Sequence, residues 1–205
     1  MGADDAVLGV DGCPGGWVGA LVQGSSVEWY VGTLADLVRL PAAVIAVDIP
    51  LVLPVGGTRR ACEVEARQLL GGQRSSVFFS PPSAVLAARS HAEASALSRQ
   101  AGSVGVSIQT WHILPKIREA LALADPRLVE AHPELSFRAM GPVTASKKTA
   151  AGRAERRALL GDPALPDVAP VEDCLDALAC AWTARRWRDG TAESLGDPAG
   201  GVIAV

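Results

Sequence analysis

Short apolar runs separated by glycine-rich turns dominate the first quarter of the chain. Three of them occupy residues 7–11, 17–22 and 27–31. Runs of this length bounded by turn residues are typical of strands, and their close spacing predicts an antiparallel meander. A fourth run, residues 43–48, is apolar on both faces until its last residue. That pattern favours a central parallel strand, which neighbouring elements cover on both sides.

The rest of the chain is mainly rich in Ala and Leu at helical spacing. We predict helices over residues 33–39, 58–70, 83–100, 107–124, 149–160 and 171–188. A fifth strand is predicted at residues 127–131, ended by His132-Pro133 because proline has no amide hydrogen for a neighbouring strand. Residues 201–205 are too few to assign.

This order of elements predicts an α/β protein. A meander followed by strand–helix crossovers gives a mixed sheet, antiparallel first and then parallel, with helices on its faces and a helical insertion in the middle. The order matches the ribonuclease H-like and actin-like arrangement, and other α/β arrangements as well. The length of 205 residues fits one domain, residues 1–205.

Composition and charge narrow the class of protein. Hydrophobic residues make up 49% and charged residues 20%, which is typical of a globular chain. The formal net charge of -3 argues against a protein that coats nucleic acid nonspecifically. A nuclease stays open, because metal ions can bridge carboxylates to phosphates.

Cysteine spacing and hydropathy indicate the compartment. The four cysteines show neither CxxC nor zinc-ligand spacing, so we expect buried thiols in a reducing environment. The first residues are acidic and lack the basic start of a secretory signal. The longest apolar stretch is broken by Asp48, Pro50 and Pro54, so we expect no membrane span. A cytoplasmic protein is the expectation.

Asp11 and Asp48 each end a predicted strand. If those strands are parallel neighbours, roughly 5 Å apart, both carboxylates emerge at one edge of the sheet. Oxygen ligands in that position suit Mg²⁺ or Mn²⁺. The alternative is that each acid stabilises the turn that follows it. Because both acids stand at the end of a predicted strand, a shared metal site is favoured over two separate turns.

A second pair of acids, Asp173 and Asp176, falls on one face of the last predicted helix. An acid in the first helical turn complements the helix dipole, which explains Asp173 without any function. Asp176 instead interrupts an apolar stretch between Leu175 and Ala177. A carboxylate there is costly unless it faces a cation or a polar site.

Further candidates flank these acids. Glu130, His132 and Glu134 surround the end of the fifth strand, and alternation puts Glu130 and His132 on one face. His132 is either a general base, a ligand, a substrate contact or a structural residue. Lys147 and Lys148 precede a helix and are placed to hold an anion. Most arginines, including Arg153 and Arg156, are interpreted as solvated positions.

The motifs taken together are similar to one family. The chain carries, in order, GVDGCPGGWVGA, AVDIPLVLP, RRACEVEARQLLG, EAHPELSF, SKKT and EDCLDALACAWTA. They resemble the bacterial and archaeal family called domain of unknown function 429, described as predicted ribonuclease H-like nucleases. The resemblance covers about residues 7–205 and implies a ribonuclease H-like fold. Glu63 and Glu172 stand where that family pattern leads us to expect Asp.

The resemblance also implies a set of site residues. It points to Asp11, Asp48, Arg60, Arg67, Glu130, His132, Glu134, Lys147, Asp173 and Asp176. Glu63 and Glu172 are left out, because the extra methylene would shift a ligand oxygen.

The main hypothesis is a metal-dependent nuclease or phosphodiester hydrolase acting on nucleic acid or a nucleotide. Expected metal ligands for Mg²⁺ or Mn²⁺ are Asp11, Asp48, Asp173 and Asp176. Expected catalytic residues are these four acids with Glu130, His132 and Glu134. Expected substrate-binding residues are Arg60, Arg67, Lys147 and Lys148. Two alternatives are a noncatalytic nucleotide- or phosphate-binding module and a structural or partner-binding protein; no oligomer is predicted.

Overall fold

The computed structural model describes residues 5–205. Most of the acidic N-terminal segment therefore lies outside the described residues. The chain divides into two compact units. One, the sheet unit, contains residues 5–48, 125–193 and 204–205; the other, the helical unit, contains residues 49–124 and 194–203. Each unit is described by itself. One domain over residues 1–205 stays a prediction.

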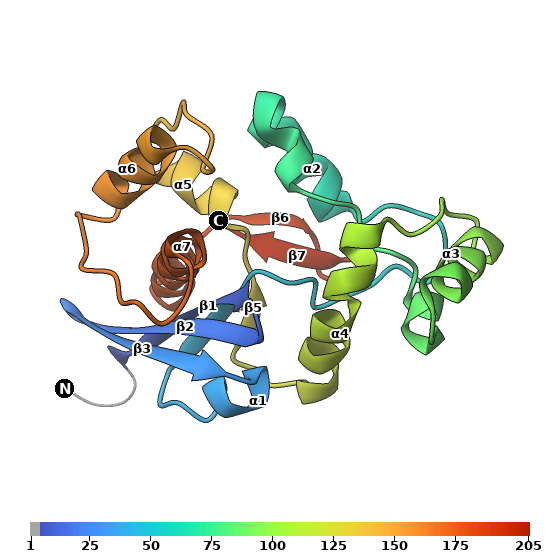
Figure 1. Cartoon of the computed structure of the whole chain (residues 1–205), viewed down its shortest axis with the longest axis horizontal. Coiled ribbons are helices and arrows are strands. Elements are labelled where there is room, and N and C mark those ends of the chain that lie inside the picture. The colour runs from blue at the N-terminus through green and yellow to red at the C-terminus, as the bar shows by residue number, and fades with distance from the viewer. Residues whose placement is uncertain (1–4) are drawn as a thin grey trace. The chain divides into compact units, whose positions relative to one another are not determined.

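A five-stranded mixed sheet forms the centre of the sheet unit. Its strands are β1 (Val7–Cys13), β2 (Gly16–Gln23), β3 (Ser26–Gly32), β4 (Val44–Val47) and β5 (Leu128–Glu130). They lie in the order β3-β2-β1-β4-β5 (Figure 1). The first three pair antiparallel, whereas β4 runs parallel to β1 and β5 parallel to β4. The predicted α/β mixed sheet is therefore confirmed.

Helix α7 (Val171–Arg188) packs on one face of this sheet, over β1, β2 and β4 (Figure 1). The approach is closest at Gly9, where a Cβ atom would lie 2.0 Å from the carbonyl oxygen of Ala177. Val7, Ala46 and Ala181 are among the buried residues between helix and sheet. Helix α7 therefore approaches β1 this closely only because residue 9 is a glycine.

Three shorter helices complete the sheet unit: α1 (Leu34–Leu37), α5 (Pro133–Met140) and α6 (Ala150–Leu159). Sequence analysis did not predict α5. Pro133 was taken only as the end of a strand, but proline also suits the first position of a helix, where the amide hydrogen has no helical acceptor. The structure uses Pro133 in that second way.

The helical unit joins short helices to a two-stranded ribbon. Its elements are α2 (Ala61–Leu70), η2 (Gly71–Ser76), η3 (Ser83–Ala87), α3 (His91–Gln100), α4 (Ile108–Leu123), β6 (Ser194–Asp197) and β7 (Gly201–Ala204, the last residue of which belongs to the sheet unit). The predicted continuous helix over residues 83–100 is wrong. Ala88 and Ser90 are extended, and the Ser90 side chain accepts from the Glu93 amide to begin α3 anew.

Residues 201–205, left unassigned from the sequence, include β7. Across residues 5–205, no helix has both the length and the apolar character needed to cross a membrane.

Candidate functional site

Asp11 is the first acid that the fold positions. Side chains alternate between the two faces along β1, and Val7 and Cys13 both pack in the core beneath α7. Asp11 shares their parity and therefore faces α7 as well. Its side chain is buried, with 8% exposed.

Asp48 lies on the neighbouring parallel strand. Its amide donates to the carbonyl oxygen of Val10 at 3.1 Å, which extends the β1–β4 ladder by one residue beyond β4. Val44 and Ala46 pack toward α7, so Asp48 has the parity of the same face. Strand β1 continues past Asp11 to Cys13, whereas Asp48 directly follows β4, so the two acids lie side by side where the parallel β1–β4 pairing ends.

Helix α7 supplies the third acid, Asp176, next to the Ala177 carbonyl that lies over Gly9. Its side chain is 3% exposed. One carboxylate oxygen, Oδ2, accepts from Lys147 Nζ at 2.7 Å. The other, Oδ1, is buried with no hydrogen-bond partner among residues 5–205. This acceptor can take a further donor or a cation.

The acids interact electrostatically, and we call Asp11, Asp48, Asp173 and Asp176 the acidic cluster. Burial raises the pKa of Asp11 well above its usual value, and repulsion from Asp176, Asp48 and Asp173 adds to the rise. Burial also raises the pKa of Asp176, to about 6, against the attraction of Lys147. The pKa of Asp48 is raised by burial and partly restored by its attraction to His132 and Lys147. Burial of these carboxylates therefore outweighs the attraction of the basic groups beside them.

Lys147 provides positive charge to this cluster. Burial alone would lower its pKa, but the attraction of Asp176, their hydrogen bond and the charges of Asp48 and Asp11 raise it overall. Its side chain remains 40% exposed. The ammonium group is thus bound to the cluster on one side and accessible to solvent on the other.

Helix α6 holds the loop that carries Lys147. The amides of Thr144 and Ala145 both donate to Glu155 at 2.9 Å. Gly152 lets the loop lie directly on the helix, since a Cβ there would stand 2.1 Å from the Ser146 carbonyl oxygen. The loop conformation is thereby tied to one helix.

Arg156 braces the same loop and was missed by sequence analysis, which interpreted it as a solvated residue. It is 2% exposed, pairs with Glu134 at 2.7 Å and donates to the Ala145 carbonyl at 3.1 Å. Gly152 lies four residues before it on the same buried face of α6. That spacing was the available signal. Glu134, expected to be catalytic, forms the buried ion pair with Arg156, and its catalytic role stays a prediction.

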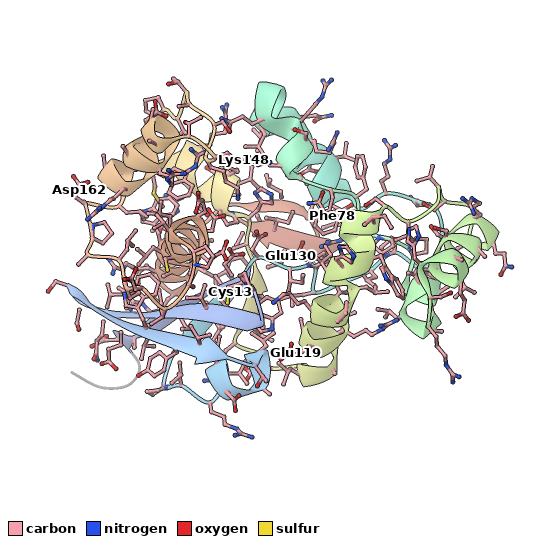
Figure 2. The ribbon with its side chains drawn as sticks, in the orientation of Figure 1. Cys13, Phe78, Glu119, Glu130, Lys148 and Asp162 are labelled. Carbon is pink, nitrogen blue, oxygen red and sulfur yellow. The ribbon has the colours of Figure 1, made fainter. Side chains whose placement is uncertain are left out.

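His132 lies near the acidic cluster, whereas Glu130 points to the other face of the sheet. His132 precedes α5, and its charge lowers the pKa of Asp48, so it lies near the cluster. Glu130, labelled in Figure 2, pairs with Val47 in the sheet. Its neighbours Val129 and Ala131 pack on the α7 side, so by alternation Glu130 points to the other face.

The remaining basic candidates do not all join the cluster. Arg60 and Arg67 belong to the helical unit. Arg60 is 3% exposed and pairs with Glu63 at 3.3 Å. Arg67 donates to the carbonyl oxygen of Val77. Both therefore brace that unit, while Lys148 is exposed in the loop before α6 (Figure 2).

The side chains of the acidic cluster offer oxygen donors to a divalent metal. Among residues 5–205 no three His, Cys, Asp or Glu side chains form a ready-made group of metal ligands. The donor chemistry nevertheless fits Mg²⁺ or Mn²⁺, because the cluster offers buried carboxylate oxygens and an excess of negative charge. Lys147 occupies Oδ2 of Asp176. A metal at this carboxylate would share it with the ammonium or displace it.

Comparisons with known proteins give one match. A family model described as "Protein of unknown function (DUF429)" matches residues 9–200, nearly the whole chain. The resemblance drawn from the motifs is thereby confirmed. No curated protein and no solved structure matches the chain.

Proposed function

The chain belongs to the DUF429 family, and from this membership and the acidic cluster we propose that it is a metal-dependent nuclease or related phosphodiester hydrolase with a ribonuclease H-like fold. An antiparallel meander followed by parallel strands is the sheet expected of that fold. The observation that carries the proposal is the meeting of Asp11, Asp48 and Asp176 from two parallel strands and a helix. Carboxylates so arranged are a common means of binding divalent metal in phosphoryl-transfer enzymes.

Asp11, Asp48 and Asp176 would hold Mg²⁺ or Mn²⁺, with Asp173 as a further ligand. The raised pKa values of Asp11 and Asp176 indicate carboxylates that gain from a cation. The buried Oδ1 of Asp176 is an acceptor in need of a partner. When bound, the metal would lower the pKa of a water molecule and neutralise charge on the phosphate.

The other residues have separate roles in this proposal. Lys147 leaves Asp176 and donates to a non-bridging phosphate oxygen. The partly exposed side chain of Lys147 is accessible to such a substrate. His132, near Asp48, accepts or delivers a proton. Arg156 and Glu134 are positioning residues, because they hold the loop that carries Lys147.

Metal binding is the first test. Calorimetric titration with Mn²⁺ should show binding to the wild-type protein and a loss of at least about tenfold in Asp11→Asn and Asp176→Asn. The matched control is Asp162→Asn, because Asp162 is exposed and its left-handed backbone suits asparagine (Figure 2). Binding that is absent, or indifferent to both cluster substitutions, would refute the metal site.

Cleavage is the second test. Single-stranded DNA, duplex DNA, RNA and an RNA–DNA hybrid are each incubated with the protein and Mn²⁺. We expect at least one to be cleaved by the wild type and by Asp162→Asn but not by Asp11→Asn. Activity that persists in Asp11→Asn would come from a contaminant. Metal and nucleotide binding with no cleavage would support the noncatalytic module instead.

Nucleic acid is thus the proposed substrate class, and the cytoplasm the proposed compartment. The four cysteines are buried and form no disulfide bond within residues 5–205, which suits a reducing environment.

A further inference from the structure

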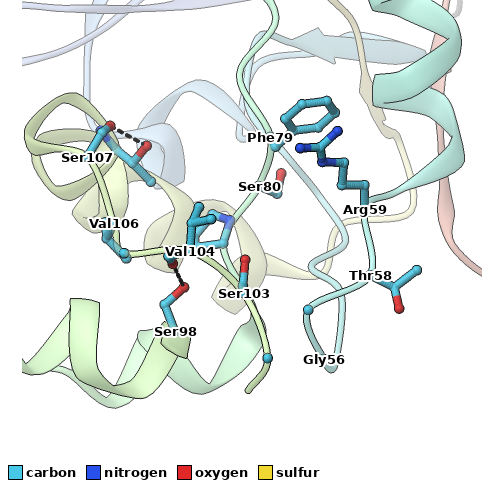
Figure 3. Close-up of a pocket in the computed structure, with 15 residues that line it drawn as sticks. Gly56, Thr58, Arg59, Phe79, Ser80, Ser98, Ser103, Val104, Val106 and Ser107 are labelled. Atoms are coloured by element: carbon cyan, nitrogen blue, oxygen red, sulfur yellow. Dashed lines mark hydrogen bonds between the residues drawn. The ribbon is translucent and has the colours of Figure 1, made fainter. Parts of the chain in front are cut away.

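A second concave site lies in the helical unit, built from residues that the proposed hydrolase mechanism does not use. It is a cavity of about 430 Å³ between the loops at residues 56–59, 79–81 and 102–107 (Figure 3). Small-molecule sites commonly fall at roughly 300–1,000 Å³. The cavity is therefore large enough for a ligand of metabolite size.

Hydroxyl groups and glycines dominate the lining. The hydroxyl residues are Thr58, Ser80, Ser98, Ser103, Ser107 and Thr110. No carboxylate is among the described residues that line it. Ser98, Ser107 and Thr110 already form hydrogen bonds within the protein, and the lining is as apolar as it is polar. The other hydroxyl groups suit a ligand that carries acceptor oxygens.

The Ser80 hydroxyl points most directly to a ligand. Ser80 is 8% exposed, and its backbone amide donates to Glu63 Oε1 at 3.0 Å. Its Oγ is buried with no hydrogen-bond partner within residues 5–205. Because buried hydroxyls are nearly always satisfied, a donor left over at a cavity wall calls for a partner that the folded chain does not supply.

The N-terminus of α4 adds a positive dipole to the same wall. The helix begins after Ser107, whose Oγ accepts from the Thr110 amide at 3.0 Å, and both residues line the cavity. The Thr110 amide is occupied by this cap, and Ile108 and Gln109 do not line the cavity, so α4 contributes its dipole and no hydrogen-bond donor of its first turn.

Arg59 contributes a full positive charge. Its side chain is exposed, and its guanidinium lies over the Phe79 ring, 4.1 Å from the ring centre (Figure 3). Within residues 5–205 it forms no ion pair. Arg67 contacts the same ring, but it donates to the carbonyl oxygens of Arg74 and Val77. Arg59 therefore retains its donors for a ligand.

We propose that this cavity binds the phosphate group of a small phosphorylated molecule. A tetrahedral anion accepts hydrogen bonds from several directions, which matches the Arg59 guanidinium and the Ser80 hydroxyl, both on residues that line this cavity. The volume leaves room for an attached polar group such as a sugar. This site is independent of the acidic cluster and needs no metal.

Calorimetry in phosphate-free buffer with a metal chelator tests the site. The probes are ribose 5-phosphate, ribose and inorganic phosphate. Wild-type protein should bind ribose 5-phosphate and, more weakly, inorganic phosphate, but not ribose. Arg59→Gln should weaken ribose 5-phosphate binding at least about tenfold, and Ser80→Ala about threefold or more. Circular dichroism verifies that both variants fold.

Two controls separate this site from the rest of the molecule. Arg74→Gln removes an exposed charge from the same unit without touching the cavity lining, and should leave the affinity unchanged. Asp11→Asn should also leave it unchanged, whatever becomes of the proposed hydrolase activity. The proposal is overturned by no binding at millimolar ribose 5-phosphate, by equal binding in Arg59→Gln, by equal binding of ribose, or by loss of binding in Asp11→Asn.

Discussion

Asp11 is buried beside three other carboxylates, and in the absence of metal this placement costs stability. Its raised pKa comes from burial first and then from the charges of Asp176, Asp48 and Asp173. Residues of active sites often carry such a cost, because a group suited to its ligand is poorly suited to the unliganded protein. The cost can be measured with a neutral side chain of the same shape.

We predict that Asp11→Asn stabilises the metal-free protein. Removing one of several buried like charges should contribute on the order of 1 kcal/mol, which for a protein of this size raises Tm by roughly 2–4 °C. Thermal melts at neutral pH with a chelator measure the shift. Asp162→Asn, at an exposed acid, should leave Tm unchanged. A lower Tm in Asp11→Asn would mean that the carboxylate has a structural role.

Arg156 affects stability through a buried ion pair. Its ion pair with Glu134 is almost wholly buried, so removal of one partner leaves an uncompensated charge. We predict that Arg156→Met lowers the free energy of unfolding by about 3–5 kcal/mol. Adding Glu134→Gln should recover part of that loss, because the stranded carboxylate is then gone. Urea unfolding of both variants gives the comparison; no recovery in the double variant would show that Arg156 acts through its backbone contacts alone.

At the level of elements, the sequence could predict what depends on local pattern. Apolar runs identified β1 and β4, and they drew attention to Asp11 and Asp48, which the structure places on neighbouring parallel strands. Asp176 stood out because a carboxylate in an apolar stretch of α7 needs a partner, and it pairs with Lys147. The strands were predictable because strand alternation is a property of adjacent residues, whereas the function of these acids stays a prediction.

Features that depend on distant partners could not be predicted. Arg156 resembles any surface arginine until α6 is packed against the loop at residues 144–149. The local sequence fits Pro133 equally well at the end of a strand and at the start of a helix. Only packing on α7 selects the helix. Glu130 was grouped with His132 by sequence spacing, whereas the pairing of β5 with β4 turns it to the other face.

Packing of α7 on β1 yields a prediction for the element as a whole. Gly9→Ala places a methyl group 2.0 Å from the Ala177 carbonyl, so the helix has to move away from the sheet. We expect a loss of about 1–3 kcal/mol in the free energy of unfolding, as for other overpacked cores. Gly72→Ala is the control, because the same methyl group there meets nothing within 4 Å.

The consequence for the site can be measured separately. A displaced α7 carries Asp176 with it, so Gly9→Ala should also weaken Mn²⁺ binding. If stability fell with unchanged metal affinity, the acids would not depend on this contact for their placement.

At the level of the whole molecule, the raised carboxyl pKa values determine how stability depends on pH. Asp176 has a pKa of about 6 in the folded protein, against an ordinary value of 3.8, which applies to the unfolded chain. Between those values the folded protein holds a proton that the unfolded chain has released. The free energy of unfolding therefore falls as pH rises through this interval. Asp11 and Asp48, whose pKa values are also raised, act in the same direction.

Other carboxyl groups act in the opposite direction but at lower pH. Hydrogen bonding, aided by attraction to nearby cations, lowers the pKa values of Asp125, Glu155 and Glu172. Their contribution to stability is therefore complete once the pH exceeds the unfolded values, at about 4–5. We therefore predict that the metal-free protein is more stable at pH 5 than at pH 7. Mn²⁺ should remove or reverse this trend, because it neutralises the cluster most effectively when the acids are ionised. Urea unfolding at both pH values, with chelator or Mn²⁺, measures the four free energies. A stability that rises from pH 5 to pH 7 in chelator, or an equal slope in Asp176→Asn, would contradict the assignment of this dependence to the acidic cluster.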